Sequence, residues 1–329
     1  MNHVILNQHI AIPCDLVVYD EIDSTNSALK RYLKQEGKPE NKKPLAVIAD
    51  RQTAGRGRLE RSWVSPAGGV YLSLLLALEA KSLGERLGSL ALVVACAARE
   101  ALSAYLDTYL DVCLDAYLDA HPSAHSSAHS GVCLSASLGS DESVASAKAA
   151  LPDPIAIKWP NDIMIRRKNH EGKLAGILIE TVDNARQIII GIGVNVTRLL
   201  QETDERAVYL SDLLPEAVSA QTSEMPELSR EIVAARIINA VCAYVKTWEE
   251  HACSAAPFKD DYEAHLTLMG KKVVVRHVNG NLAARGLVLG VNEQGQLLVQ
   301  DIQNRGEPIA VSVSDVTLRD GGGDGTPEI

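Results

Sequence analysis

The amino-acid sequence predicts an α/β protein with a small all-β domain near its C-terminal end. Over residues 13–102, short apolar runs alternate with segments of helical periodicity, which is typical of strands and helices packed in layers. Strand-like runs resume between residues 155 and 196. From Gly270 to Arg319, five short strands are separated by turn signals, and the Asn279-Gly280 pair is a strong hairpin signal. This last pattern predicts a small β-barrel.

Length and charge restrict the class of protein. The 329 residues are enough for one large or two modest domains. The 32 Lys+Arg and 42 Asp+Glu residues give a formal net charge of −10, which argues against a surface built for nucleic acid or acidic lipid. Hydrophobic residues make up 46% of the chain, but only one is Phe, so aliphatic side chains must fill the core.

Nothing in the sequence indicates a membrane or secreted protein. The longest uncharged apolar stretch, Leu90–Ala98, is shorter than the roughly 20 residues that span a bilayer. The first 15 residues lack the basic region and apolar core of a signal peptide. Six cysteines without a CxxC pair fit reduced, buried thiols. We therefore expect a soluble cytoplasmic protein with no membrane partner.

The N-terminal third predicts three strands and two helices. Strands are expected at Leu16–Tyr19, Leu45–Ala49 and Val70–Leu78, and the last should be buried on both faces because it is almost entirely apolar. Ser24 occupies an N-cap position before a helix over Ser27–Gln35. A longer helix is expected over Leu83–Ala104.

The middle of the chain has a different character. Residues 105–119 repeat a tetrapeptide with Leu at positions 106, 110, 114 and 118. Because an α-helix turns every 3.6 residues, such leucines wind round the axis, so we expect a short amphipathic extension and no long packed helix. Ser/Ala-rich sequence follows, and residues 103–153 are interpreted as a low-complexity surface insertion. Histidines at 121, 125 and 129 are a weak metal-site candidate there.

The second half completes the predicted organisation. Further strands are expected at Ile155–Lys158, Ile163–Arg166, Ala175–Glu180 and Gln187–Val196, and helices at Glu227–His251 and Phe258–His265. We assign residues 1–268 to the first domain, 269–320 to the β domain and 321–329 to a disordered tail.

The segment from Gln52 to Trp63 is the sharpest local feature. It contains three arginines, and a fourth, Arg51, directly precedes it. Two glycines let its backbone approach a ligand closely. Arginine forks suit phosphate and carboxylate geometry, so the segment fits an oxyanion such as a nucleotide phosphate. A solvated basic turn is the alternative. The segment is neither a Walker A loop nor a dinucleotide fingerprint.

Three further motifs are weaker when taken singly. Lys158 to Asp162 lies between two apolar strands and suits either a magnesium–phosphate site or a simple turn. Lys173 enters a strand of small residues, where it could equally be a surface lysine. Gly191 and Gly193 mark close approach of a ligand or backbone, and the neighbouring Asn195 could read an adenine edge or a ribose hydroxyl.

Taken together and in this order, the motifs resemble those of biotin protein ligases. They are EIDSTN (21–26), QTAGRGRLERSW (52–63), KWPND (158–162), KLAGILIE (173–180) and GIGVNV (191–196). The resemblance implies an α/β (α+β) catalytic domain on a mixed sheet like that of class II aminoacyl-tRNA synthetases, followed by an SH3-like barrel. It also implies an ATP-dependent ligase that joins biotin to AMP and then to a lysine of a biotin carboxyl carrier protein, such as that of acetyl-CoA carboxylase.

The resemblance also assigns roles to residues. It implies catalytic roles for Lys173, Arg58 and Asp162, with Asp162 also holding Mg²⁺. The residues implied to bind biotin are Ser24, Thr25, Asn26, Gln52, Gly55, Arg56, Arg58, Lys173 and Gly176. Those implied to bind ATP or the adenylate are Arg56, Arg58, Arg61, Trp63, Lys158, Asn161 and Asn195.

Three departures from the family pattern and two alternatives accompany this assignment. Glu60 stands where the family often has Gly, and the insertion at residues 103–153 interrupts the link before KWPND. Only 23 residues precede Ser24, so we expect no DNA-binding domain and no repressor function. A lipoate–protein ligase or octanoyltransferase on the same fold is one alternative. A regulator that binds biotinyl-AMP without catalysis is the other. A monomer and a homodimer are both compatible with the sequence.

Overall fold

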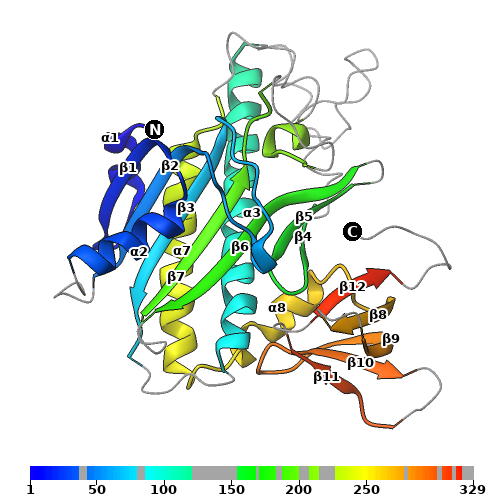
Figure 1. The fold of residues 1–329 in the computed structure, drawn as a ribbon. Helices are drawn as coiled ribbons and strands as arrows, with labels where there is room; N and C mark the ends of the chain where they lie inside the picture. The colour runs from blue at the N-terminus through cyan, green and yellow to red at the C-terminus, as the bar shows by residue number, and fades with distance from the viewer. Residues whose placement is uncertain are drawn as a thin grey trace.

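The computed structural model describes residues 1–36, 43–79, 86–120, 154–167, 170–182, 187–199, 207–214, 227–277, 281–301, 306–312 and 316–320. These residues form a large mixed sheet with helices on both faces and a smaller antiparallel sheet beside it (Figure 1). The predicted α/β class with a C-terminal β unit is confirmed. The candidate histidines at 121, 125 and 129, the Asn279-Gly280 pair and the tail 321–329 lie outside the described residues.

The large sheet has seven strands in the order β1-β2-β3-β7-β6-β5-β4. Only β1 and β2 are parallel, and every other neighbouring pair is antiparallel. All but the last residue of β3 are buried, as its apolar sequence predicts. The strands are β1 (Asp15–Ile22), β2 (Leu45–Gln52), β3 (Gly69–Ala77), β4 (Ile155–Lys158), β5 (Asp162–Arg167), β6 (His170–Val182) and β7 (Gln187–Asn195).

Helices cover the two faces of this sheet unequally. The long helices α3 (Leu87–Ala120) and α7 (Arg230–Glu250) pack together on one face, and α1 (His3–His9) packs against α7 (Figure 1). Among the described helices, α2 (Thr25–Gln35) covers part of the other face, over β2, β3 and β7. The main hydrophobic core therefore lies on the α3–α7 side, and part of the opposite face is left for a binding site.

Helix α3 corrects one prediction. It continues through the tetrapeptide repeat to Ala120, and the repeat residues Tyr105, Leu106, Tyr109, Leu110 and Cys113 are buried. A four-residue spacing drifts by only about 40° per step on an α-helix, so the stripe stays on one face for two turns. The prediction that no long packed helix forms here is therefore wrong. The surface insertion predicted from residue 103 is wrong up to residue 113, and residues 121–153 lie outside the described parts.

The same helix passes a length and composition test for a membrane span. Leu87–Cys113 has a mean hydropathy of 1.5 in its most apolar window, but 67% of that window is buried inside the protein. Burial of this kind is typical of a core helix, because its apolar face already contacts protein. No other helix in the described ranges passes the test.

The second sheet contains the five predicted short strands, in the order β11-β10-β9-β8-β12, and all neighbours are antiparallel. Valines and leucines from alternate positions form its buried side. The short helix α8 (Lys259–Ala264) precedes it. The strands are β8 (Lys272–His277), β9 (Leu282–Val291), β10 (Leu297–Asp301), β11 (Ile309–Val311) and β12 (Val316–Asp320).

The two sheets are joined by buried hydrogen bonds. The indole Nε1 of Trp159 donates to the Gly295 carbonyl at 3.0 Å, across 136 residues of sequence. The Ile157 amide donates to the His265 carbonyl, and the Thr267 amide donates back to Ile157, both at 2.8 Å. The turn at Gly295 is therefore fixed against the strand that leads into the KWPND motif.

Gly295 has a backbone that other residues rarely adopt. Its φ is +79°, and a Cβ there would lie 2.7 Å from the Gly88 carbonyl oxygen. We expect Gly295→Ala to lower the free energy of unfolding by more than about 2 kcal/mol, because left-handed strain and a backbone clash add together. Urea denaturation measures this loss.

Gly270→Ala is the matched control for this prediction. Its φ is +69°, but an added Cβ would have open space around it. It should lose only the cost of the left-handed conformation, about 1–2 kcal/mol. Equal losses in the two variants would contradict the idea that the Gly295 turn is tightly packed against α3.

Candidate functional site

The face of the sheet opposite α3 carries a glycine floor formed by β6 and β7. Gly176 and Gly193 lie opposite each other in the antiparallel pair, and Gly191 lies opposite Leu178. A Cβ on Gly176 or Gly193 would come within 3.0 Å or 2.6 Å of the Trp63 indole. The ring of Trp63 therefore lies directly on the floor, where no side chain larger than hydrogen could stand.

Trp63 also carries an unpaired polar group. Its indole Nε1 is buried and has no hydrogen-bond partner among the described residues. A buried donor without an acceptor costs about 1–3 kcal/mol. The ammonium of Lys173 lies 5.0 Å from the centre of the Trp63 ring, in cation–π range.

Lys173 and Asp162 form an ion pair beside this ring. The Lys173 Nζ lies 2.7 Å from Asp162 Oδ1, and both side chains are partly exposed. The pairing of β5 with β6 places Asp162 opposite Gly176, so the carboxylate begins its strand at the edge of the glycine floor. Lys158 lies opposite Asp162 at the end of β4. The structure thus brings together two of the three predicted catalytic residues.

Arg58 reaches the same edge from the loop. Its Nη1 donates to Asn161 Oδ1 at 3.1 Å, and Asn161 is itself bonded to the main chain of Ile177. Burial lowers the pKa of the Arg58 guanidinium, the Asp162 carboxylate opposes that shift, and the charge of Arg61 adds to it. The group stays cationic, because the ordinary pKa of an arginine lies far above neutral pH. Arg61 is exposed, and its charge acts on the Arg58 guanidinium.

The loop between Gly55 and Trp63 has an unusual backbone. It closes on itself through bonds from the Gly57 amide to the Arg61 carbonyl (2.7 Å) and from the Trp63 amide to the Gly55 carbonyl (2.9 Å). Leu59 and Glu60 have φ of +53° and +59°, in the left-handed region that favours glycine. This explains in physical terms why glycine suits the position that Glu60 occupies here.

The N-terminus of α2 is tied to the end of β2. Ser24 caps the helix by accepting a hydrogen bond from the Ser27 amide, as predicted. The backbone amide and hydroxyl of Thr25 both donate to Gln52 Oε1, at 2.9 and 3.2 Å. Gln52 in turn donates to Ser65 at 2.9 Å. The predicted biotin-binding residues Ser24, Thr25 and Gln52 therefore form one connected unit.

Glu180 at the end of β6 joins three donors that the sequence analysis did not connect. Its carboxylate accepts from Asn26 Nδ2 at 2.8 Å and from Lys30 Nζ at 2.6 Å. Arg56 approaches the same two oxygens at 3.2 and 3.4 Å. Arg56, predicted to contact both ligands, thus points at Glu180. Two features of the sequence could have indicated this cluster: the acidic residue at the end of the KLAGILIE motif, and a lysine four residues after Asn26.

The Glu180 carboxylate is ionised at neutral pH. Burial by itself raises the pKa of this carboxyl, but hydrogen bonds from Lys30 and Asn26 and the charges of Lys30 and Arg56 outweigh it. The net result is a pKa below the usual 4.5. Because folding lowers this pKa, the carboxylate stabilises the fold above the unfolded value, and the contribution is lost as the pH falls through the folded value.

Asn195 does not present its amide to the glycine floor. Its Nδ2 donates to the carbonyls of Lys173 and Val208, at 3.2 and 3.3 Å. The side chain is buried and holds the segment after β7 against the start of β6. An adenine contact through this Nδ2 would require one of these bonds to break.

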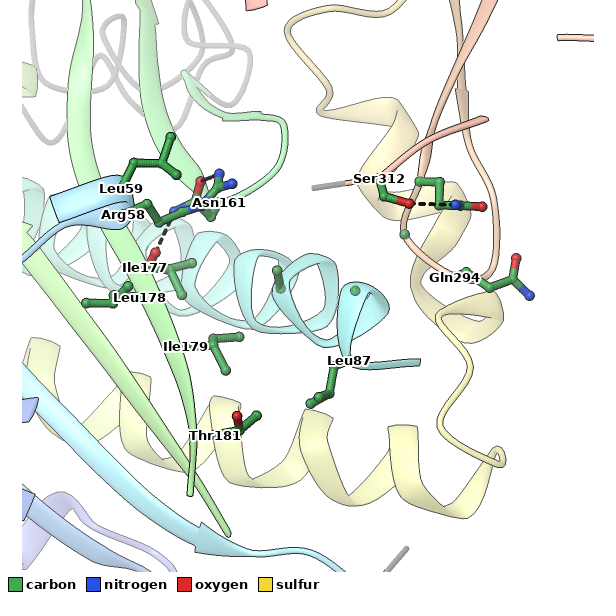
Figure 2. Close-up of a pocket in the computed structure, with 14 residues that line it drawn as sticks. Arg58, Leu59, Leu87, Asn161, Ile177, Leu178, Ile179, Thr181, Gln294 and Ser312 are labelled. Carbon is green, nitrogen blue, oxygen red and sulfur yellow. Dashed lines mark hydrogen bonds between the residues drawn. The ribbon is translucent and has the colours of Figure 1, made fainter. Parts of the chain in front are cut away.

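A cavity of about 600 Å³ adjoins the site (Figure 2). Arg58 and Asn161 line one end, and Gln294 and Ser312 of the C-terminal sheet line the other. Ile177 and Ile179 supply apolar surface to its wall. The described residues contain no group of three or more His, Cys, Asp or Glu side chains that could hold a metal ion.

The mixed sheet, its glycine floor and the arginine-rich loop define an α/β domain built to bind a ligand that carries negative charge. The sequence model described as "Biotin/lipoate A/B protein ligase family" matches residues 18–195, which include the first four motifs of this site and the fifth, GIGVNV, up to Asn195. The chain belongs to this family.

Individual relatives agree with the family. A protein of Bacillus spizizenii named "Bifunctional ligase/repressor BirA" is 26% identical over 297 residues, which cover 90% of this chain and 70% of that protein. The "Biotin--[acetyl-CoA-carboxylase] ligase" of Mycobacterium tuberculosis is 32% identical over 183 residues, which cover 56% of this chain and 60% of that protein.

A solved structure shares the fold. The biotin protein ligase of Aquifex aeolicus in complex with biotin and ATP has a TM-score of 0.62 and 23% identity, covering 93% of this chain and 99% of that one. At this identity the likeness establishes the fold alone.

The glycine floor yields a testable prediction. In Gly193→Ala, the new methyl group must displace the Trp63 indole, whose Nε1 would otherwise lie 2.6 Å away. We therefore expect Trp63 to become more accessible to acrylamide. The quenching reports on Trp63, because the other two tryptophans, Trp159 and Trp248, are 3% and 0% exposed and contribute little to it.

Gly191→Ala separates this effect from general loss of packing. Its methyl group would meet Asn26, not Trp63. It should lower stability without raising the quenching of the folded protein. Equal quenching of Gly193→Ala and the unmodified protein would show that Trp63 does not rest on the floor.

Proposed function

We propose that this chain is a biotin protein ligase, which joins biotin to AMP from ATP and then transfers biotin to a lysine of a biotin carboxyl carrier protein. The observation that carries the proposal is the meeting of Lys173, Asp162 and the unpaired indole N–H of Trp63 above the glycine floor. A ligand atom that accepts this N–H would remove the cost of burying it. Family membership and the named relatives support the same assignment.

The first half-reaction brings two anions together. The carboxylate of biotin attacks the α-phosphate of ATP, and the two groups repel each other in a site with little water. Lys173 and Arg58 supply positive charge at the edge of the glycine floor, which offsets this repulsion. Lys173 can contact the carboxylate and the phosphate in turn, and so can follow the charge as it moves.

Asp162 suits Mg²⁺ as a single protein carboxylate. Mg²⁺ commonly takes one or two carboxylates and completes its octahedron with phosphate oxygens and water. When bound with ATP, the ion would neutralise phosphate charge. Asp162 would serve as the ligand, while its partner Lys173 turns to the substrate anions.

Biotin also presents a neutral ureido ring, which needs both donors and acceptors. Ser24, Thr25, Asn26 and Gln52 supply these groups from α2 and the end of β2. Gly55 admits no larger side chain here, because a Cβ would lie 2.3 Å from the Trp63 carbonyl oxygen. The pocket is therefore fixed by backbone as well as by polar side chains.

The second half-reaction needs a neutral amine. The acceptor lysine has an ordinary pKa of about 10.4, so a group in the site must take or orient its proton. Asp162 would take or orient this proton once Lys173 has turned to the adenylate. The acidic net charge, −10, fits the further proposal that this protein does not contact DNA through a basic surface.

The test of the proposed function is pyrophosphate release from ATP. Biotin alone should support release, and a carrier domain should then become biotinylated on one lysine. Lipoate or octanoate in place of biotin should give no release. Release with lipoate instead would assign the chain to the other branch of the family, and binding without release would indicate a non-catalytic regulator.

Asp162→Asn distinguishes two roles for that carboxylate. We expect transfer to the carrier lysine to slow by about 100-fold or more and pyrophosphate release by much less, because general-base assistance contributes about 10²–10⁴. Single-turnover measurements of each step give the two rates. An equal fall in both steps would point to magnesium binding as the main role.

Loop closure is the last prediction of this mechanism. The adenylate is a mixed anhydride that water would hydrolyse, so residues 54–63 should close over it. We expect trypsin to cut this arginine-rich loop more slowly when biotin and ATP are present. Cleavage at the same rate with and without these ligands would count against closure.

A further inference from the structure

Glu180 lies outside the predicted ligand set, yet it contacts two of the predicted site residues, Asn26 and Arg56, and also Lys30. Two of its donors, Asn26 and Lys30, lie one turn apart on α2. The third, Arg56, comes from the loop. A single carboxylate on β6 therefore joins the sheet, the helix that supplies the ureido contacts, and the loop that must close.

The charge of Glu180 fixes the orientation of Asn26. An ionised carboxylate can only accept hydrogen bonds, so the Asn26 amide nitrogen must face it. The Asn26 oxygen then faces the hydroxyl of Ser73, with which it is hydrogen-bonded. A Cβ on Gly191 would lie 2.3 Å from that oxygen, so the amide has no room to tilt. Glu180 therefore determines which end of the Asn26 amide is the donor and which is the acceptor.

The same carboxylate holds the loop. Both terminal nitrogens of Arg56 approach Glu180, as in a forked arginine–carboxylate pair, although the two distances are long for ideal geometry. Arg58, two residues on, is bonded to Asn161. The two arginines of the Gly-Arg-Gly-Arg segment are therefore anchored to different elements, Arg56 to β6 and Arg58 to the turn between β4 and β5.

We infer that Glu180 is a positioning residue for biotin recognition: it sets the donor and acceptor pattern of Asn26 and anchors the loop through Arg56. The inference rests on the proposed function and deepens it. Glu180 acts before the chemistry, so it should affect the binding of biotin more than the rate of adenylation. Arg56 belongs with Glu180 in this role, and Arg58 belongs with the reacting groups.

Glu180→Gln tests the inference directly. A glutamine can offer an N–H to Asn26 and so permits the opposite amide orientation, and it leaves Lys30 and Arg56 without a counter-charge. We expect the KM for biotin in pyrophosphate release to rise at least tenfold, about 1.4 kcal/mol, with kcat within threefold. We also expect trypsin to cut the ligand-free loop at least fivefold faster.

Two further variants separate positioning from simple charge pairing. Glu250→Gln makes the same chemical change in an exposed pair with Lys246 at the end of α7 and should leave KM and cleavage within twofold. Lys30→Met keeps the contacts of Glu180 with Asn26 and Arg56 and should raise KM less than threefold. An effect of Lys30→Met as large as that of Glu180→Gln would overturn the inference.

The double variant Glu180→Gln/Lys30→Met guards against misfolding. The charges of residues 30, 56 and 180 then sum to +1, as in the unmodified protein. If the charge imbalance of Glu180→Gln destabilises the fold, the double variant should therefore still fold. Its KM should still be raised; a normal KM in the folded double variant would also overturn the inference.

The outcomes distinguish this inference from the proposed function. If the unmodified protein releases no pyrophosphate with biotin and ATP, the proposed function fails. The trypsin comparison on ligand-free protein still tests the anchoring of the loop by Glu180. Unchanged cleavage in Glu180→Gln would refute that anchoring whatever the activity.

Discussion

The site depends on the antiparallel pairing of β6 with β7. This register places Gly176 opposite Gly193 and so creates a flat area that only an aromatic ring or a ligand can cover. The same strand carries Lys173 at one end and Glu180 at the other, seven residues apart, or about 23 Å of extended chain. One strand thus supplies both the ammonium for the reacting anions and the carboxylate that holds the recognition elements. A register shift of one residue would turn all of these side chains to the opposite face.

The fold was largely predictable, because its strands are short apolar runs between clear turn signals. The repeat in α3 was the main failure. Reasoning from the period of the leucines overlooked the tyrosines and the cysteine beside them, which broaden the apolar stripe enough for α7 and the loop segments to cover it. The periodicity of a sequence shows which side of a helix is apolar. How wide an apolar surface can be buried depends on the neighbouring elements of the fold, which the local sequence does not specify.

The contacts within the site were less predictable than the fold. Lys173 and Asp162 carry opposite charges at strand ends in separate motifs, and the sheet brings them to 2.7 Å. The partner of Arg56 was not predictable, because an arginine in a glycine-rich loop can reach any nearby anion. Nothing local identifies Glu180, 124 residues away, as that anion. The commitment of Asn195 to main-chain carbonyls is hidden from the sequence for the same reason.

The length of α3 has a consequence for how this chain can vary. A helix of 34 residues is about 50 Å long, and its first residue, Leu87, lines the cavity between the sheets. The polypeptide therefore leaves the helix at Ala120, a full helix length from that cavity. The entropy of closing a loop grows only slowly, by about 0.6 kcal/mol for each doubling of its length. Changes in the length of the sequence between Ala120 and β4 should therefore carry little thermodynamic cost.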